Sequence, residues 1–270
     1  MRIAWIGNSY MYFNELPAMV MNMLAAAGVA AECKEVTPGG ERFAGHAVDS
    51  RVATLLSESW DVVILQDNSG VPGGYNFDAL MASRAALMTA LVPQVPDTAR
   101  LVLYGTWGHL RGSVYEDQQS AYPDYVTMQR RTTDGIEGYV ELIKGSAPSR
   151  SVEFAPVGDA FLILYNEEVQ AGRDPLEPDS LFARLYAPDA FHPSRIGSFL
   201  AACVFTRVLL EGDDARISQS LAFRPADSCK LDRRLQDKYG DEWAPRIMDE
   251  ADVARVQRAA AKALEARVRL

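Results

Sequence analysis

The stretch RIAWIGNSY, residues 2–10, joins an apolar run to a glycine and a polar pair. Its apolar residues follow one another without alternation, which is typical of a strand covered on both faces. Gly7 ends the run, and Asn8 and Ser9 follow at once. The stretch therefore predicts a buried first strand that delivers a serine hydroxyl to its carboxyl end, either as a nucleophile or as part of a tight turn. Asn14 is expected to cap the helix that comes next.

Four further apolar runs follow, and helical patterns separate them. The runs are AECKEVT (31–37), WDVVILQ (60–66), ARLVLYGTW (99–107) and SVEFAPVG (151–158). Such alternation predicts an α/β fold with a five-stranded parallel sheet and helices on both faces, a three-layer α/β/α sandwich. Ligands of such sheets bind beyond the carboxyl ends of the strands. The side chains expected at that edge are Ser9, Asn68, Trp107 and Asp159, although the simplest role for Asp159 is to cap the helix after the fifth strand.

The character of the chain changes after Gly212, which predicts two parts. Residues 1–212 carry the strand and helix alternation, whereas residues 213–270 are polar and rich in charge. An amphipathic helix is expected from Asp249 onward. Its apolar positions are Val253, Val256, Ala260, Leu264 and Val268. This C-terminal helical extension is expected to pack on the core, to cover the site or to mediate a homodimer, and the pattern does not separate these roles.

The charge and the cysteines exclude several classes of protein. The net charge is -9, which argues against nucleic acid or an anionic membrane as the main partner, because both need basic patches. Cys33, Cys203 and Cys229 have no paired spacing, so neither a disulfide framework nor a metal site is expected. No apolar run reaches the length of a membrane span, and no leader pattern is visible. A cytoplasmic location is the expectation.

A second chemistry-bearing stretch is PDAFHPSRIG, residues 188–197. Asp189 and His192 are three residues apart, so on a turn entering a helix both side chains can point the same way. The carboxylate can then accept a hydrogen bond from one imidazole nitrogen, which leaves the other nitrogen to take a proton from a serine. Asp189, His192 and Ser9 are therefore the candidate catalytic residues. This chemistry needs no metal or other cofactor.

Acyl transfer also needs donors for the developing oxyanion. Ser9 brings its own backbone N–H at the strand-helix turn. Gly40, in the loop after the second strand, can present a backbone N–H with no side chain in the way. After the third strand, either Gln66 or Asn68 can donate a side-chain N–H.

These residues resemble the ordered blocks of the SGNH (GDSL-like) hydrolases. Gly7-Asn8-Ser9-Tyr10 resembles the first block, Gly40 the second-block glycine, VVILQDNSG the third block, and DAFHP the Asp-x-x-His block. The resemblance covers residues 1–212 and implies a flavodoxin-like fold and a serine esterase or acyl-transfer mechanism. It also implies Ser9 as nucleophile, His192 as base and Asp189 as its partner.

The chain departs from this family at two points. Asn8 stands where the family usually has aspartate, and this GNSY form resembles a poorly characterised bacterial branch. The usual Gly-x-Asn-Asp of the third block is absent, so Gln66, by its position, and Asn68, by its residue type, both remain candidates for the third oxyanion donor.

The substrate is suggested by aromatic residues near the expected site. Tyr10 and Trp107, with His109 and Arg111 in the loop after the fourth strand, are expected to line a partly apolar pocket that takes a small ester. An O-acetyl group on a carbohydrate is the first substrate expected. An acyltransferase with the same triad and a non-catalytic binding domain are the alternatives. The glycine-rich stretches lack the order and the lysine of a phosphate loop, so nucleotide binding is not expected.

Overall fold

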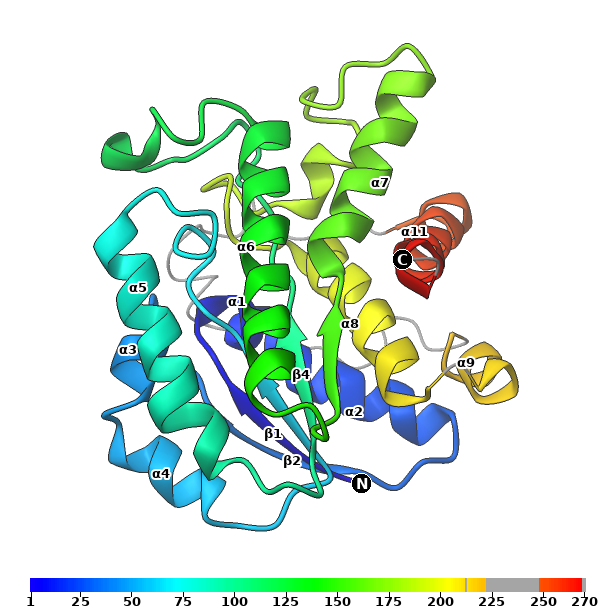
Figure 1. Cartoon of the computed structure of the whole chain (residues 1–270). Coiled ribbons are helices and arrows are strands. Elements are labelled where there is room, and N and C mark those ends of the chain that lie inside the picture. Colours follow the sequence, from blue (N-terminus) through cyan, green and yellow to red (C-terminus); the bar gives the residue numbers. More distant parts are fainter. Residues whose placement is uncertain (212, 222–247, 269–270) are drawn as a thin grey trace.

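A computed structural model describes residues 1–211, 213–221 and 248–268 of the chain. Within these residues the predicted α/β sandwich is confirmed: five strands form one parallel sheet in the order β2-β1-β3-β4-β5 (Figure 1). This is the flavodoxin-like order, in which the chain reverses direction beside the first strand. The strands are β1 (Arg2–Ile6), β2 (Glu32–Val36), β3 (Val62–Leu65), β4 (Arg100–Tyr104) and β5 (Val152–Ala155).

The register of the sheet explains the hydropathy of its strands. Ile3 pairs with Cys33 of β2 on one side and with Val62 of β3 on the other, so β1 lies inside the sheet. Residues of β3 are buried throughout, as their continuous apolar sequence predicts. β2 is largely exposed because it forms an edge, and this accounts for its weaker apolar pattern.

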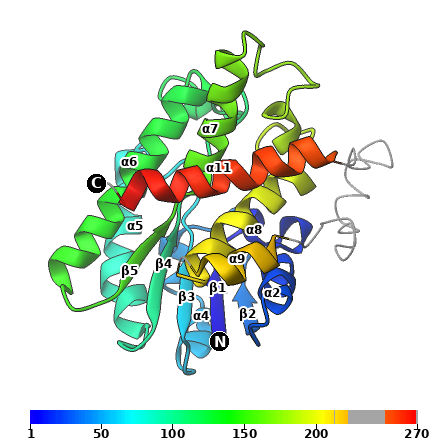
Figure 2. The same cartoon turned by 90° about the vertical axis from the view of Figure 1, so that its right-hand side faces the viewer.

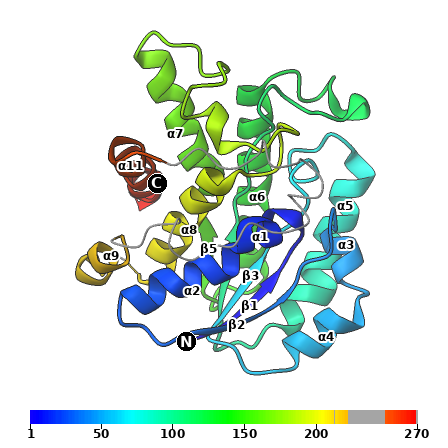
Figure 3. The same cartoon turned by 180° about the vertical axis from the view of Figure 1, so that it is seen from behind.

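Helices cover both faces of the sheet, and alternate residues of β1 contact the two layers. Ile3 and Trp5 belong to one apolar cluster, and Ala4 and Ile6 belong to the other. Figure 1 shows the layer of α3 (Phe43–His46), α4 (Ser50–Leu56), α5 (Phe77–Ala86) and α6 (Tyr125–Ser146). Figure 3 shows the opposite layer, with α2 (Leu16–Ala26), α7 (Val157–Gln170), α8 (Arg195–Leu209) and α9 (Asp214–Ser220). The remaining short helices are α1 (Ser9–Tyr12), η1 (Phe13–Glu15), η2 (Leu87–Leu91), η3 (Val92–Gln94), η4 (Glu116–Gln118) and η5 (Ala183–Leu185).

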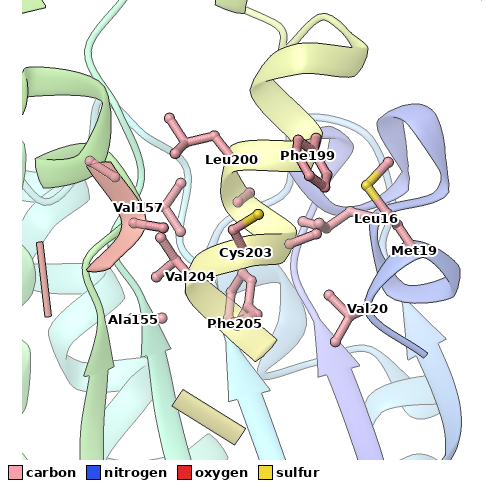
Figure 4. Close-up of a cluster of buried hydrophobic side chains, with 14 of the residues drawn as sticks. Leu16, Met19, Val20, Ala155, Val157, Phe199, Leu200, Cys203, Val204 and Phe205 are labelled. Carbon is pink, nitrogen blue, oxygen red and sulfur yellow. The ribbon is translucent and has the colours of Figure 1, made fainter. Parts of the chain in front are cut away.

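Helix α8 is the buried centre of its layer. Its side chains Phe199, Cys203 and Phe205 are fully buried, and Figure 4 shows them on α8 beside the apolar side chains Leu16, Met19 and Val20 of α2. Ser194 caps the helix, since its hydroxyl accepts from the N–H groups of Ile196 and Gly197. The helix therefore fixes the place of the Asp-x-x-His turn that precedes it.

Two predicted caps are wrong. Asn14 has a left-handed backbone (φ 54°) and does not cap α2, which begins at Leu16. Its side chain instead donates to Pro193 O at 3.1 Å and to Ser198 Oγ at 2.8 Å, across the layer. Asp159 lies in the first turn of α7 but does not cap it, because its carboxylate accepts hydrogen bonds from Arg267.

The C-terminal helix α11 (Glu250–Val268) lies across α7 and α8 (Figure 2). Val253, Val256 and Ala260 are buried, and Leu264 packs against the same apolar cluster. The amphipathic face expected from the sequence thus contacts the core. The rest of the predicted extension, residues 222–247 and 269–270, and the side chain of Val268 lie outside the described part of the chain. Among the helices of the described ranges, none has the length and apolar content that a membrane span requires.

Candidate active site

Ser9 stands at a sharp turn between β1 and α1. β1 ends at Ile6, Asn8 is the N-cap, and Ser9 is the first residue of α1. A Cβ on Gly7 would lie 2.5 Å from Gln66 Oε1 and 2.6 Å from Met11 Sδ. A larger residue at this position would therefore have to displace the ends of the Gln66 and Met11 side chains. Because Ser9 is the first helical residue, its N–H has no acceptor inside the helix.

Asn8 holds the turn through both ends of its amide. Its Oδ1 accepts from Tyr10 N at 3.2 Å and from Gln66 Nε2 at 2.8 Å. Its Nδ2 donates to Glu41 O at 3.0 Å, in the loop after β2. An aspartate accepts hydrogen bonds but donates none when ionised. Asparagine at this position therefore links the serine turn to a neighbouring backbone carbonyl that a carboxylate would repel.

Asp189 and His192 are oriented by the turn between them. Asp189 Oδ1 accepts from the backbone N–H groups of Phe191 at 3.3 Å and His192 at 3.0 Å, as a capping side chain does. Its other oxygen, Oδ2, lies 2.7 Å from His192 Nδ1. Ala190 between them has a left-handed backbone, with φ 66°. Both ends of the carboxylate are thus engaged by the same short turn.

His192 completes a chain of hydrogen bonds that ends at Ser9. His192 Nε2 lies 2.8 Å from Ser9 Oγ. With Nδ1 donating to Asp189, neutral His192 has Nε2 free to accept the hydroxyl proton, an assignment that follows from the partners of the ring. The arrangement supplies a nucleophile, a base within reach and a group that orients the base.

Two loops bring the candidate oxyanion donors to the same place. Gly40 has φ 71°, and a Cβ built on it would meet nothing within 4 Å. Glycine is thus favoured there by the left-handed backbone and not by crowding. Asn68 lines the cavity at Ser9. Its Oδ1 accepts from Gly70 N at 3.2 Å, and its Nδ2 makes only a long contact, 3.4 Å, with Gly40 O.

Gln66 lies behind the site instead of in it. Its Oε1 accepts from Asn8 N at 3.0 Å, and its Nε2 donates to Asn8 Oδ1 and, at 3.0 Å, to Asp67 O. Both amide hydrogens are therefore engaged, and the side chain is buried and does not line the cavity. The geometry favours Asn68 over Gln66 as the third donor.

Asp67 is a buried carboxylate that no sequence pattern singled out. Its Oδ1 accepts from Phe43 N at 3.1 Å and from Asn68 N at 2.9 Å. Its Oδ2 accepts from the hydroxyl of Tyr139 at 2.8 Å. Burial raises the pKa of this carboxyl. Asp67 thus ties the segment after Gly40 to the backbone of Asn68.

The cavity at Ser9 has a volume of about 220 Å³. Of the side chains expected to bind substrate, Tyr10 and His109 line it and Trp107 and Arg111 do not. The Trp107 ring is stacked between Tyr10 and Phe161, at 4.3 and 4.6 Å, and its Nε1 donates to Phe191 O at 3.0 Å. Arg111 donates to Leu176 O. Lining residues that the sequence did not single out are Tyr12, Gly39, Ser69, Tyr115 and Phe191.

A larger groove of about 890 Å³ lies beside β5, between α6, α8, α9 and α11. Its lining residues include no serine, cysteine or histidine. It therefore offers no hydroxyl or thiol nucleophile paired with a histidine, and the smaller cavity is the candidate active site. Within the described residues, no group of three histidine, cysteine or acidic side chains is arranged to hold a metal ion.

Solved structures share this fold. A protein of the DUF4886 family from Bacteroides uniformis ATCC 8492 is 15% identical with a TM-score of 0.68, over 98% of this chain and 95% of that chain. A carbohydrate esterase family 3 protein from Talaromyces cellulolyticus is 13% identical with a TM-score of 0.54, over 78% of this chain and 97% of that chain. At these identities the likeness shows the fold alone. No protein-family model matches the sequence, and no curated protein matches it.

Proposed function

We propose that this protein is a serine esterase that removes a short acyl group from an ester through an acyl-enzyme on Ser9. The observation that carries the proposal is the hydrogen-bonded series Ser9 Oγ, His192 Nε2, His192 Nδ1 and Asp189 Oδ2, with distances of 2.8 and 2.7 Å. These distances fall within the reach that a nucleophile and its base require. Ser9 and His192 line a cavity, so a substrate can reach them.

The reaction proceeds in two halves. Ser9 Oγ attacks the ester carbonyl carbon while His192 Nε2 takes the hydroxyl proton. The tetrahedral intermediate collapses, the bond to the alcohol oxygen breaks, and His192 returns the proton to that oxygen. Water then attacks the acyl-serine, again losing its proton to His192, and the acid is released. Asp189 stabilises the imidazolium in both halves and stays ionised.

The oxyanion of each intermediate is stabilised by donors from residues that line the cavity. In this proposal they are the N–H groups of Ser9 and Gly40 and the side-chain Nδ2 of Asn68. Removing one donor of this kind typically costs about 100- to 1,000-fold in kcat. Asn68→Ala is therefore expected to lose activity on that scale, whereas loss of Gln66 would act only through the fold of the Ser9 turn.

The cavity limits the acyl group. Its volume of about 220 Å³ is smaller than the roughly 300–1,000 Å³ that encloses a drug-sized ligand. An acetyl group fits this limit better than a fatty acyl chain. A carbohydrate O-acetyl ester is the first natural substrate to test, and the name of the carbohydrate esterase family 3 neighbour is in keeping with it.

Hydrolysis of p-nitrophenyl acetate by the wild type, Ser9→Ala and Ser57→Ala tests the proposal. Ser57 is an exposed serine at the end of α4 and serves as the matched control. We expect Ser9→Ala to lose at least about 1,000-fold in kcat and Ser57→Ala to match the wild type. A fluorophosphonate should label the wild type and Ser57→Ala but not Ser9→Ala. Equal rates for wild type and Ser9→Ala would refute the nucleophile assignment.

A further inference from the structure

His109 lines the cavity at Ser9 but takes no part in the series that ends at Asp189. Tyr115 and Phe191, whose rings lie near that of His109, line the same cavity, as do Gly40 and Asn68. The ring centroid of His109 is 5.8 Å from that of Tyr115 and 5.3 Å from that of Phe191. The His109 ring is buried, with 1% of the residue exposed. A polar side chain at such a position needs a partner or a ligand.

The hydrogen bonds of His109 determine where its proton lies. Its Nδ1 is 3.1 Å from the backbone N–H of Val114, which can only donate, so Nδ1 accepts and is unprotonated. Burial, and then repulsion from His192, lowers the pKa of His109 to about 3. A neutral ring with an unprotonated Nδ1 carries its proton on Nε2. In the described part of the chain, this Nε2 has no hydrogen-bond partner.

The alcohol part of the ester must lie near His192, and His109 is close to His192 in the same cavity. His192 returns its proton to the leaving oxygen, so that oxygen must come close to His192 Nε2. Phe191 joins the two histidines, since its ring centroid is 4.0 Å from that of His192 and 5.3 Å from that of His109. The acyl oxygen, by contrast, belongs with the proposed oxyanion donors.

We propose that the Nε2–H of His109 donates a hydrogen bond to a hydroxyl of the alcohol part of the ester, and that Tyr115 packs against the ring that carries this hydroxyl. This inference rests on the proposed esterase function and adds to it a specificity for the alcohol part of the ester. The site would then select acetyl esters of polyhydroxylated rings, such as a carbohydrate, over acetyl esters of plain cyclic alcohols. A site built to bond a hydroxyl discriminates against an analogue without it, because the buried donor is then left unpaired.

The test compares a mono-O-acetylated methyl xyloside with cyclohexyl acetate, whose ring is of similar size but bears no hydroxyl. We expect the wild type to prefer the xyloside ester in kcat/KM by at least about tenfold, the size of one hydrogen bond. In His109→Phe, which keeps an aromatic ring without a donor, this preference should fall by about 10- to 100-fold. In His109→Gln, whose amide supplies a donor near the same place, part of the preference should return.

Arg111→Ala is the matched control, because Arg111 lies in the same loop and its guanidinium turns away to Leu176 O. Its preference should equal that of the wild type. A wild type without preference for the xyloside ester, or a His109→Phe variant with the preference intact, would overturn the inference. Failure of the esterase function itself would look different, with no hydrolysis of either ester and no fluorophosphonate labelling.

A second measurement does not depend on the folding of any variant. The ¹⁵N resonances of the histidine rings in the wild type report which nitrogen carries the proton. We expect His109 to be protonated on Nε2 and not on Nδ1 throughout pH 5 to 8. A proton on Nδ1 would overturn the inference, because Nε2 would then be an acceptor.

Discussion

The imidazole ring of His192 lies parallel to the phenyl ring of Phe13, with centroids 4.0 Å apart and 6° between the planes. Phe13 follows the short helix that begins at Ser9, and His192 comes from a turn 179 residues after Phe13 in the sequence numbering. Asn14, the next residue, donates to Pro193 O at 3.1 Å. The segment that carries the nucleophile therefore also holds the segment that carries the base, so contacts outside the triad set the distance between Ser9 and His192.

Replacing Phe13 by leucine should weaken this arrangement without removing a reacting group. Leucine keeps an apolar side chain but loses the stacked ring, which is worth about 0.5–1.5 kcal/mol. If that energy orients the base, kcat for p-nitrophenyl acetate should fall about 2- to 10-fold while KM stays unchanged. Steady-state kinetics measure kcat and KM separately. A change in KM with constant kcat would mean that Phe13 contacts substrate instead of positioning His192.

Replacing Asp189 by asparagine should separate the two tasks of this side chain. Asparagine Oδ1 can still accept from Phe191 N and His192 N, so the turn should persist. Its NH₂ group would face His192 Nδ1, which favours the tautomer with the proton on Nε2, and that nitrogen then cannot accept from Ser9. We expect a loss of about 1,000- to 10,000-fold in kcat with a nearly unchanged melting temperature. An active variant would show that the carboxylate is not needed to orient the base.

Replacing Asn8 by aspartate tests the role of the amide group at this position. The carboxylate would lose the hydrogen bond to Glu41 O, now 3.0 Å from Nδ2, and would place negative charge against that carbonyl. Loss of such a buried partner costs about 1–3 kcal/mol. Asn8→Asp should therefore lower the free energy of unfolding by that amount, measured by urea denaturation. Asn8→Ser, which keeps an N-cap oxygen but also lacks the amide donor to Glu41 O, adds no negative charge and should lose less stability than Asn8→Asp. An Asn8→Asp variant as stable as the wild type would contradict this account.

The sequence predicted the parts of the molecule that depend on position along a strand. Three of the five apolar runs became strands with most of their residues buried, the run 31–37 became the exposed edge strand β2, and the run 151–158 became the half-buried edge strand β5. The ends of parallel strands meet at one edge, so Ser9 and Asn68 could be expected near each other. The turn from Asp189 to His192 could be read from a spacing of three residues. Each of these predictions depends only on the course of the backbone and not on side-chain contacts.

Side-chain directions beyond the strand ends could not be predicted in the same way. Trp107 and His109 both follow β4, yet Trp107 is stacked between two aromatic rings in the core while His109 lines the cavity. Gln66 and Asn68 both follow β3, yet the side chain of Gln66 is hydrogen-bonded to Asn8, whereas Asn68 lines the cavity. The partner to which a side chain bonds or against which it stacks comes from residues far away in the sequence. A local sequence pattern therefore does not predict it.

Acid should destabilise the folded protein through its buried histidines. Burial lowers the pKa of His46 and lowers that of His109 to about 3, whereas a histidine in the unfolded chain titrates near 6.5. Between pH 6.5 and 3 the unfolded state therefore binds a proton on His109 that the folded state does not bind. The free energy of unfolding should fall as the pH decreases through this window, by up to about 1.4 kcal/mol per pH unit for each such histidine.

Comparison with His109→Gln isolates this contribution. Burial raises the pKa of Asp67, so Asp67 acts with the opposite sign: its folded form keeps a proton above pH 3.8 that the unfolded form has released. A variant without the imidazole retains the Asp67 contribution and loses only that of His109. Urea denaturation between pH 4.5 and 7.5 should therefore give a shallower acid loss for His109→Gln than for the wild type. Parallel curves would show that His109 does not stay neutral in the fold.

Arg267 should stabilise the docking of α11 without affecting catalysis. Its guanidinium donates to Asp159 Oδ2 at 2.8 and 2.6 Å and to Glu137 Oε1 at 2.5 Å, and it lies 4.0 Å above the ring of Phe154. The Asp159 carboxylate is partly buried, and removal of Arg267 would leave it with the hydroxyl of Thr133 but without this charged partner. Arg267→Ala should lower the free energy of unfolding by about 1–3 kcal/mol, and Arg267→Lys by less, because lysine keeps the charge without the planar fork. Since Arg267 lines the larger groove and not the cavity at Ser9, kcat/KM of the folded variants should match the wild type. A loss of activity that exceeds the loss of folded protein would mean that α11 influences the active site.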